Sequence, residues 1–259
     1  MQKRTYWVAL GLAALLGCGT DSTVREVREL RISGHLPEAR EHALAALQQD
    51  PSHLELWLEF AHTAVDQTRQ AEREQDPQSL NYLVEASLLC GGYYKFQNQD
   101  PPKDWRDVSR LAAGEAVKQG NITLTTLRSQ SQSADYLNQL LTMRRGDSGM
   151  DGAQMSAAQM VEGYRAGARD MLFQSVLVVR LLEMLPEVSS GSSTILVAQI
   201  QSARDEWRQA LELPADLVDT MTQRANHSVD TAFNRVLDDF RTLGYAVPET
   251  IIENGILGS

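Results

Sequence analysis

A pattern of two helices joined by a tight turn, over residues 24–51, constrains the fold of this chain more than any other feature. Apolar residues recur at spacings of three and four on both sides of a turn at Gly34, and this spacing places them on one face of each helix. Pro37 suits the first turn of the second helix, and Glu38 adds a favourable negative charge there. Asp50-Pro51 is expected to end that helix, because proline disfavours helical geometry in the residue before it.

The small and apolar residues of this pattern resemble a tetratricopeptide repeat, a helical hairpin of about 34 residues whose helices touch through small side chains. When the repeat starts at Thr20, the family's contact, turn, small and terminal positions fall on Val27, Leu30, Gly34, Ala39, Ala43, Ala46 and Pro51. A second repeat in the same register selects Trp57, Phe60, Ala61 and Ala64. The resemblance covers about residues 20–65. It then departs, since Pro77 would fall inside the next helix, and the third helix is expected to run on to about Asp76.

Periodic apolar residues predict further helices at about residues 78–97, 103–118, 123–143, 153–185, 193–211 and 214–243. The Ser/Gln stretch over residues 129–133 has the composition of a linker, but apolar residues flank it, so a polar helical turn is the alternative. Gly163 and Gly167 are expected to permit close helix packing. The predicted fold class is all-α, with tetratricopeptide-like helical hairpins at the N-terminus that continue into an irregular helical bundle or solenoid.

The most apolar run outside the N-terminus covers residues 171–185. Apolar side chains occupy nearly every face of it, which is typical of a buried core helix. A membrane span would need roughly 20 apolar residues, and Arg180 and Glu183 interrupt the run. We therefore expect a central helix of the protein core.

Residues 1–17 have the features of a secretory signal. Lys3 and Arg4 precede an apolar run, and small residues stand before a cleavage point. The end of this run, Leu15-Leu16-Gly17-Cys18, resembles the lipobox of bacterial lipoproteins. In that family the signal is cut before the cysteine, so the resemblance implies that Cys18 carries fatty-acyl chains such as palmitate. A plain signal cleaved near Cys18 and an uncleaved anchor are the alternatives.

The lipoprotein resemblance also predicts a location and a domain organisation. Cys18 is followed by Gly19 and not by the aspartate that retains many Gram-negative lipoproteins in the inner membrane, which favours a periplasm-facing protein of the outer membrane. The predicted parts are a signal peptide (1–17), a lipidated tether (18–23), a tetratricopeptide-like region (24–98), a helical bundle region (102–245) and a tail (246–259). Lipidation of Cys18 leaves Cys90, which follows two leucines and is expected to be a buried small hydrophobe.

Charge and motifs exclude several classes of function. The net charge is −10, and removal of Lys3 and Arg4 with the signal would make it −12, so phosphate backbones repel the chain and nucleic acid is not an expected partner. Neither a nucleophile elbow nor a phosphate loop is present. Glu59 and His62 form one Glu-x-x-His step. A metal site needs more converging ligands than this step supplies, so we interpret it as part of a solvated helical face. We expect no enzyme, no cofactor and no metal.

The remaining prediction is a non-catalytic interaction or scaffold module that binds other proteins or peptides of the cell envelope. In the resembling family the binding face is built from the first helix of each hairpin, which implies Arg28, Arg31, Trp57, His62 and Thr63, with a structural role as the alternative for Trp57. The Gly91-Gly92-Tyr93-Tyr94-Lys95-Phe96 cluster is either an aromatic patch for a partner or a helix break with packed rings.

A second hypothesis is a ligand-binding accessory component of an envelope transport system. It requires a central cavity among the helices after residue 103, which would be lined by Met155, Met160, Tyr164, Met171 and Phe173. An open surface beside residues 24–65 would instead favour the interaction module. No oligomeric state is predicted.

Overall fold

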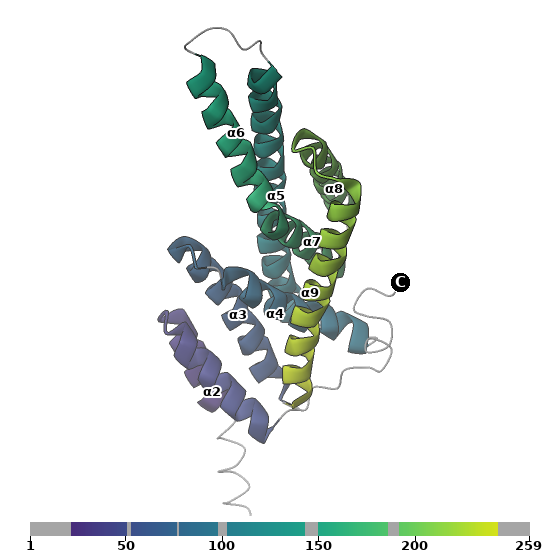
Figure 1. The fold of residues 1–259 in the computed structure, drawn as a ribbon. Helices are drawn as coiled ribbons and strands as arrows, with labels where there is room; N and C mark the ends of the chain where they lie inside the picture. Colours follow the sequence, from purple (N-terminus) through teal and green to yellow (C-terminus); the bar gives the residue numbers. More distant parts are fainter. Residues whose placement is uncertain are drawn as a thin grey trace, which may run out of the picture. The chain divides into compact units, whose positions relative to one another are not determined.

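The computed structural model describes residues 22–50, 53–76, 78–97, 103–142, 150–185 and 192–242. Every regular element in these ranges is a helix, which confirms the all-α fold class. A first helix over residues 22–32 is followed by α2 (Leu36–Gln49), α3 (Leu54–Glu74), α4 (Ser79–Gln97), α5 (Lys103–Thr142), α6 (Met150–Ala166), α7 (Ala168–Met184), α8 (Ser192–Ala210) and α9 (Ala215–Thr242) (Figure 1). None of these helices combines the length and apolarity that crossing a bilayer requires.

The chain divides into two compact units, and each is described by itself. The first unit contains the described residues up to Ala112 and the end of α9 from Val236, and the second unit contains Ala113–Arg235. The signal peptide, Cys18 and the tail predicted over residues 246–259 lie outside the described residues. Of the predicted tether, residues 22 and 23 already belong to the first helix.

The first hairpin of the first unit forms as the sequence predicts. Gly34 adopts a φ of +85°, a left-handed conformation that glycine tolerates best. The amide of His35 donates to the carbonyl of Leu30 at 2.9 Å and that of Gly34 to Arg31 at 3.1 Å, which satisfies the last carbonyls of the helix. α2 then starts with proline in its first turn and buries Leu36, Ala39, Ala43 and Leu47.

The helix α3 is the centre of the first unit, because it packs against both α2 and α4. Trp57 and Phe60 are buried on it with ring centroids 6.1 Å apart and a 56° tilt, a favourable aromatic arrangement. α3 runs to Glu74, close to the predicted end. Cys90 is fully buried on α4, as expected for a small hydrophobe.

The helix α5 differs from the prediction of two helices over residues 103–118 and 123–143. It is continuous over 40 residues, so the break expected over residues 119–122 is helical, and residues 129–133 form the polar helical turn given as the alternative to a linker. Tertiary contacts explain this result. Trp207 of α8 donates from its indole nitrogen to Gln130 at 2.9 Å, and a Cβ at Gly120 would lie only 2.8 Å from Leu196 Cδ2. These contacts with α8 hold stretches that have low helix propensity by themselves.

The single helix predicted over residues 153–185 is also wrong, because the chain breaks into α6 and α7 at Gly167. Among the described residues, no other element packs closely on Gly163 or Gly167, which contradicts the role expected for these glycines. A Cβ at Gly163 would meet nothing within 4 Å, and one at Gly167 would meet only carbonyls of α6 at 3.8 Å. The core prediction for residues 171–185 is confirmed, with Leu172, Ser175, Val176, Leu177, Val178, Leu181, Leu182 and Leu185 buried.

Candidate functional site

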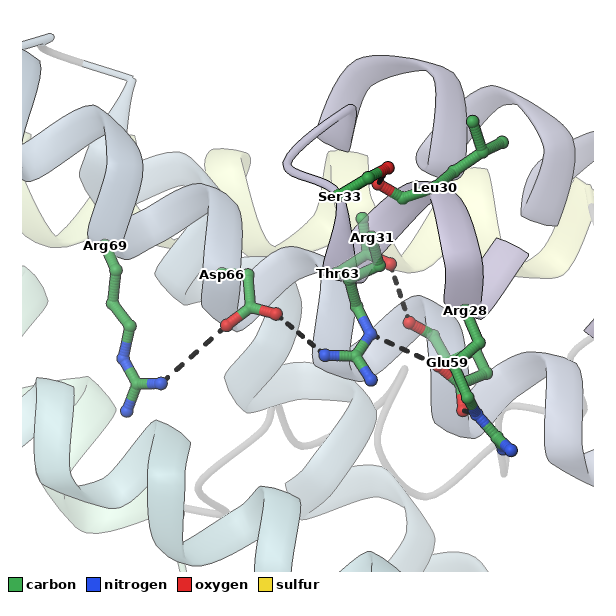
Figure 2. Close-up of polar contacts among 8 residues, drawn as sticks. All are labelled: Arg28, Leu30, Arg31, Ser33, Glu59, Thr63, Asp66 and Arg69. Atoms are coloured by element: carbon green, nitrogen blue, oxygen red, sulfur yellow. Dashed lines mark hydrogen bonds and ion pairs between the residues drawn. The ribbon is translucent and has the colours of Figure 1, made fainter. Parts of the chain in front are cut away.

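The first helices of the two hairpins, residues 22–32 and α3, meet through a cluster of charged side chains. Arg28 Nε donates to Glu59 Oε1 at 2.6 Å, and Arg31 Nε donates to Glu59 Oε2 at 3.2 Å. Arg31 also donates from Nη1 to Asp66 Oδ2 at 2.9 Å, and Arg69 lies 3.7 Å from the other oxygen of Asp66. Figure 2 shows Arg31 between the two carboxylates. We call Arg28, Arg31, Glu59, Asp66 and Arg69 the ion-pair cluster.

Helical spacing explains why these side chains converge. Arg28 and Arg31 are three residues apart on the first helix, and Glu59, Asp66 and Arg69 recur along one stripe of α3. The Glu59 side chain is only 3% exposed, whereas Arg31 is 17% and Arg28 is 50% exposed. A buried carboxylate is costly unless it is paired and hydrogen-bonded, so the two arginines are what allow Glu59 to be buried.

An open hollow of about 460 Å³ adjoins the ion-pair cluster. It is lined by Arg31, Gly34, Leu36, Asp66, Arg69, Gln70, Arg73 and Glu74. Three arginines and two carboxylates give this arginine-lined hollow a local formal charge of +1 in a chain of net charge −10. Arg31 and Arg69 pair with Asp66, and Arg73 Nε donates to the Arg69 carbonyl at 3.2 Å. The terminal nitrogens of Arg73 are therefore best placed to bind a carboxylate or another planar anion.

His62 lies on α3 beside the cluster and is half-buried. Desolvation lowers the pKa of its imidazole, and the nearby charge of Arg31 lowers it further, while Glu59 and Asp66 act in the opposite direction. The interpretation of Glu59 and His62 as a solvated face is corrected for Glu59, whose carboxylate is buried and bound by arginines. The described residues contain no group of three His, Cys, Asp or Glu side chains that could hold a metal ion.

No family model, no curated protein and no solved structure matches this chain. The assignment of a site therefore rests on the geometry alone.

The structure brings together only part of the predicted partner-binding set. Arg28, Arg31 and His62 lie at the ion-pair cluster, but Trp57 is 2% exposed and Thr63 is fully buried. The Thr63 hydroxyl donates to the Glu59 carbonyl at 2.8 Å, so neither side chain is available to a partner in this fold. Tyr93 and Tyr94 belong to α4, but their side chains lie outside the described part, as does Cys18.

Sequence reasoning missed Asp66, Arg69 and Arg73. Together with Glu59 and His62 they form a series with alternating steps of three and four residues. Such a series places the side chains on one charged stripe along α3 and can be detected in the sequence. That stripe faces both the first helix and the arginine-lined hollow. A search for charged i, i+3 and i, i+4 series along the predicted helix would have found it.

Proposed function

We propose that this chain is a lipid-anchored, non-catalytic lipoprotein that binds other proteins or peptides of the bacterial cell envelope. The observation that carries the interaction role is the pairing of the two first helices through the ion-pair cluster, with the arginine-lined hollow beside it. Stacked helical hairpins commonly offer such surfaces to peptides. The anchor is supported by the signal-like residues 1–17 and the lipobox at Cys18.

The charge of the arginine-lined hollow indicates which chemical group a binding partner would place there. Arg69 and Arg73 line an open hollow, and guanidinium groups bind carboxylates in a planar, two-pronged geometry. An acidic side chain or a peptide C-terminus fits this chemistry better than a basic or apolar segment. The rest of the chain carries net negative charge and repels an acidic partner, so such a partner is best accommodated at a locally positive face such as this one.

Site-specific crosslinking in living bacteria tests the interaction role. A photoreactive phenylalanine replaces Arg73 at the hollow or, as the control, the exposed Arg128 on α5. We expect a discrete crosslinked species from position 73 and not from position 128, and its loss when Arg69→Glu reverses a charge of the hollow. Identical products from the two positions would contradict a specific face.

Metabolic labelling with an alkyne fatty acid tests the anchor. The wild-type chain and the Cys90→Ala control are expected to take up label, and Cys18→Ala is expected to take up none. Label retained in Cys18→Ala would remove the lipoprotein part of the proposal while leaving the crosslinking result intact.

The alternative proposal, an accessory ligand-binding component of a transport system, has one supporting observation. Of the five side chains expected around a cavity, Met155 and Met160 are exposed, while Phe173 lines a hollow between α7 and α9. Retention of a small molecule by the purified monomeric chain would favour this function over the interaction module.

A further inference from the structure

A hollow of about 260 Å³ lies between α7 and α9 within the second unit. Its lining comes from consecutive turns of the two helices and consists of Arg169, Asp170, Phe173, Met221, Arg224, Ala225 and Ser228. Further along the same helices, Arg180 Nη2 lies 3.6 Å from Asp230 Oδ1, so α7 and α9 are in direct contact. We call this feature the α7–α9 hollow.

The arginines of this hollow differ from Arg180, which also lies between α7 and α9. Arg180 has a carboxylate partner, whereas Arg169 and Arg224 have no hydrogen bond or ion pair in the described part of the chain. Asp170 belongs to the same lining and is likewise not paired with either arginine in the described part of the chain. The hollow thus has a local formal charge of +1 and two guanidinium groups whose donors are available to a ligand.

Three of the residues that line the hollow are apolar. Phe173 and Met221 are half-buried and Ala225 is buried, whereas the polar lining residues Arg169, Asp170, Arg224 and Ser228 are exposed. Apolar side chains combined with a few polar groups are the usual composition of a small-molecule site. A flat aromatic or branched apolar group can cover Phe173 and Met221 while its charged end reaches the arginines.

We propose that the α7–α9 hollow binds a small amphipathic anion, a carboxylate carried on a compact apolar body. The carboxylate accepts hydrogen bonds from Arg169 and Arg224, and the apolar body packs on Phe173 and Met221. The volume falls below the roughly 300–1,000 Å³ of common ligand pockets, which selects a compact ligand and excludes a long acyl chain. This site lies in the second unit and does not depend on the interaction face of the first.

Fluorine NMR titration of the purified full chain tests the proposal, with 4-fluorophenylacetate as the anionic probe and 4-fluorophenylacetamide as its neutral match. We expect saturable binding of the carboxylate, about tenfold tighter than binding of the amide, because a charge-assisted hydrogen bond contributes on the order of one factor of ten. Arg169→Gln and Arg224→Gln are each expected to weaken carboxylate binding by about threefold to tenfold.

Arg128→Gln is the matched control, since Arg128 lies on α5 in the same unit, is exposed and does not line the hollow. Its binding curve is expected to equal that of the wild type. Phe173→Ala is expected to weaken both probes, which separates the apolar contact from the charged one. Equal binding of acid and amide, no saturation, or carboxylate binding that survives both arginine variants would overturn the proposal. Circular dichroism checks that each variant keeps its helices.

Discussion

Arg31 donates from its Nε to Oε2 of Glu59 across 3.2 Å, and the Glu59 side chain is 3% exposed. The two residues are 28 positions apart in sequence, so this contact fixes the first helix against α3. Loss of this contact is expected to lower the stability of the fold, because it would leave the Glu59 carboxylate buried with less compensating charge, and an uncompensated buried charge costs much more than an exposed one.

Replacement of Arg31 by methionine is expected to destabilise the chain by about 1.5–3 kcal/mol. Breaking a buried pair usually costs about 3–5 kcal/mol, and Arg28 still pairs with Glu59 at 2.6 Å, which reduces the loss. Urea unfolding followed by circular dichroism measures the change. Arg25→Met is the control on the same helix, because the Arg25–Glu29 pair is largely exposed and should leave the midpoint unchanged. Equal effects of the two variants would show that the burial of Glu59 is unimportant.

Replacement of Arg40 by lysine is expected to destabilise the chain although the charge is kept. Both terminal nitrogens of Arg40 donate to the Glu85 carboxylate of α4, one of them at 2.7 Å. The guanidinium carbon also lies 5.1 Å from the centre of the Phe60 ring. Lysine cannot reproduce the planar fork or the stacking, so we expect a loss of about 1–2 kcal/mol in urea unfolding. Arg25→Lys serves as the control, and an unchanged Arg40→Lys protein would contradict the role of the fork.

Local signals in the sequence were sufficient for the first hairpin. Gly34 supplies the left-handed residue of the turn, Pro37 starts the next helix, and alanines mark the buried face of α2. Each of these features acts over a few residues, so it can be recognised without knowledge of the rest of the fold. The burial of the 171–185 run follows in the same way from its composition.

Features that depend on distant contacts could not be predicted. Glu59 looks solvated in a helical pattern because its partners are 28 and 31 residues away. The break expected over residues 119–122 was wrong because Leu196, which lies close to Gly120, belongs to α8, far along the chain. Gly167 was ambiguous for another reason, since a single glycine in an apolar helical pattern can be tolerated or can end the helix.

Alanine substitutions at two glycines of α5 are expected to change the stability of the chain by different amounts or in opposite directions. Gly114→Ala should stabilise the chain by about 0.5–1 kcal/mol, because alanine is the better helix former and its Cβ meets nothing within 4 Å. At Gly120 the new Cβ would lie 2.8 Å from Leu196 Cδ2 and 3.2 Å from Leu182 Cδ1, so this gain is offset by side-chain movement. Thermal unfolding should rank Gly114→Ala above the wild type and Gly120→Ala at or below it. The reverse order would contradict the close approach of α8.

The lowered pKa of His62 predicts a pH dependence of stability. Burial and the charges of Arg31 and Arg28 favour the neutral imidazole in the folded chain, and Glu59 and Asp66 oppose them only in part. The unfolded chain therefore takes up a proton near the ordinary value of 6.5, before the folded chain does. The unfolding free energy should fall as the pH drops through 6.5 towards the lowered folded pKa, and no such loss should occur above this window.

His62→Gln is expected to flatten this dependence, because the titrating group is gone from both states. The free energy of unfolding in urea, measured between about pH 5.5 and about pH 7.5, should change less in the variant than in the wild type. His35→Gln, in the exposed turn before α2, is the control and should keep the wild-type slope. Identical slopes for wild type and His62→Gln would mean that His62 titrates alike in the folded and unfolded chains. That result would contradict the prediction that folding lowers the pKa of the half-buried His62 imidazole.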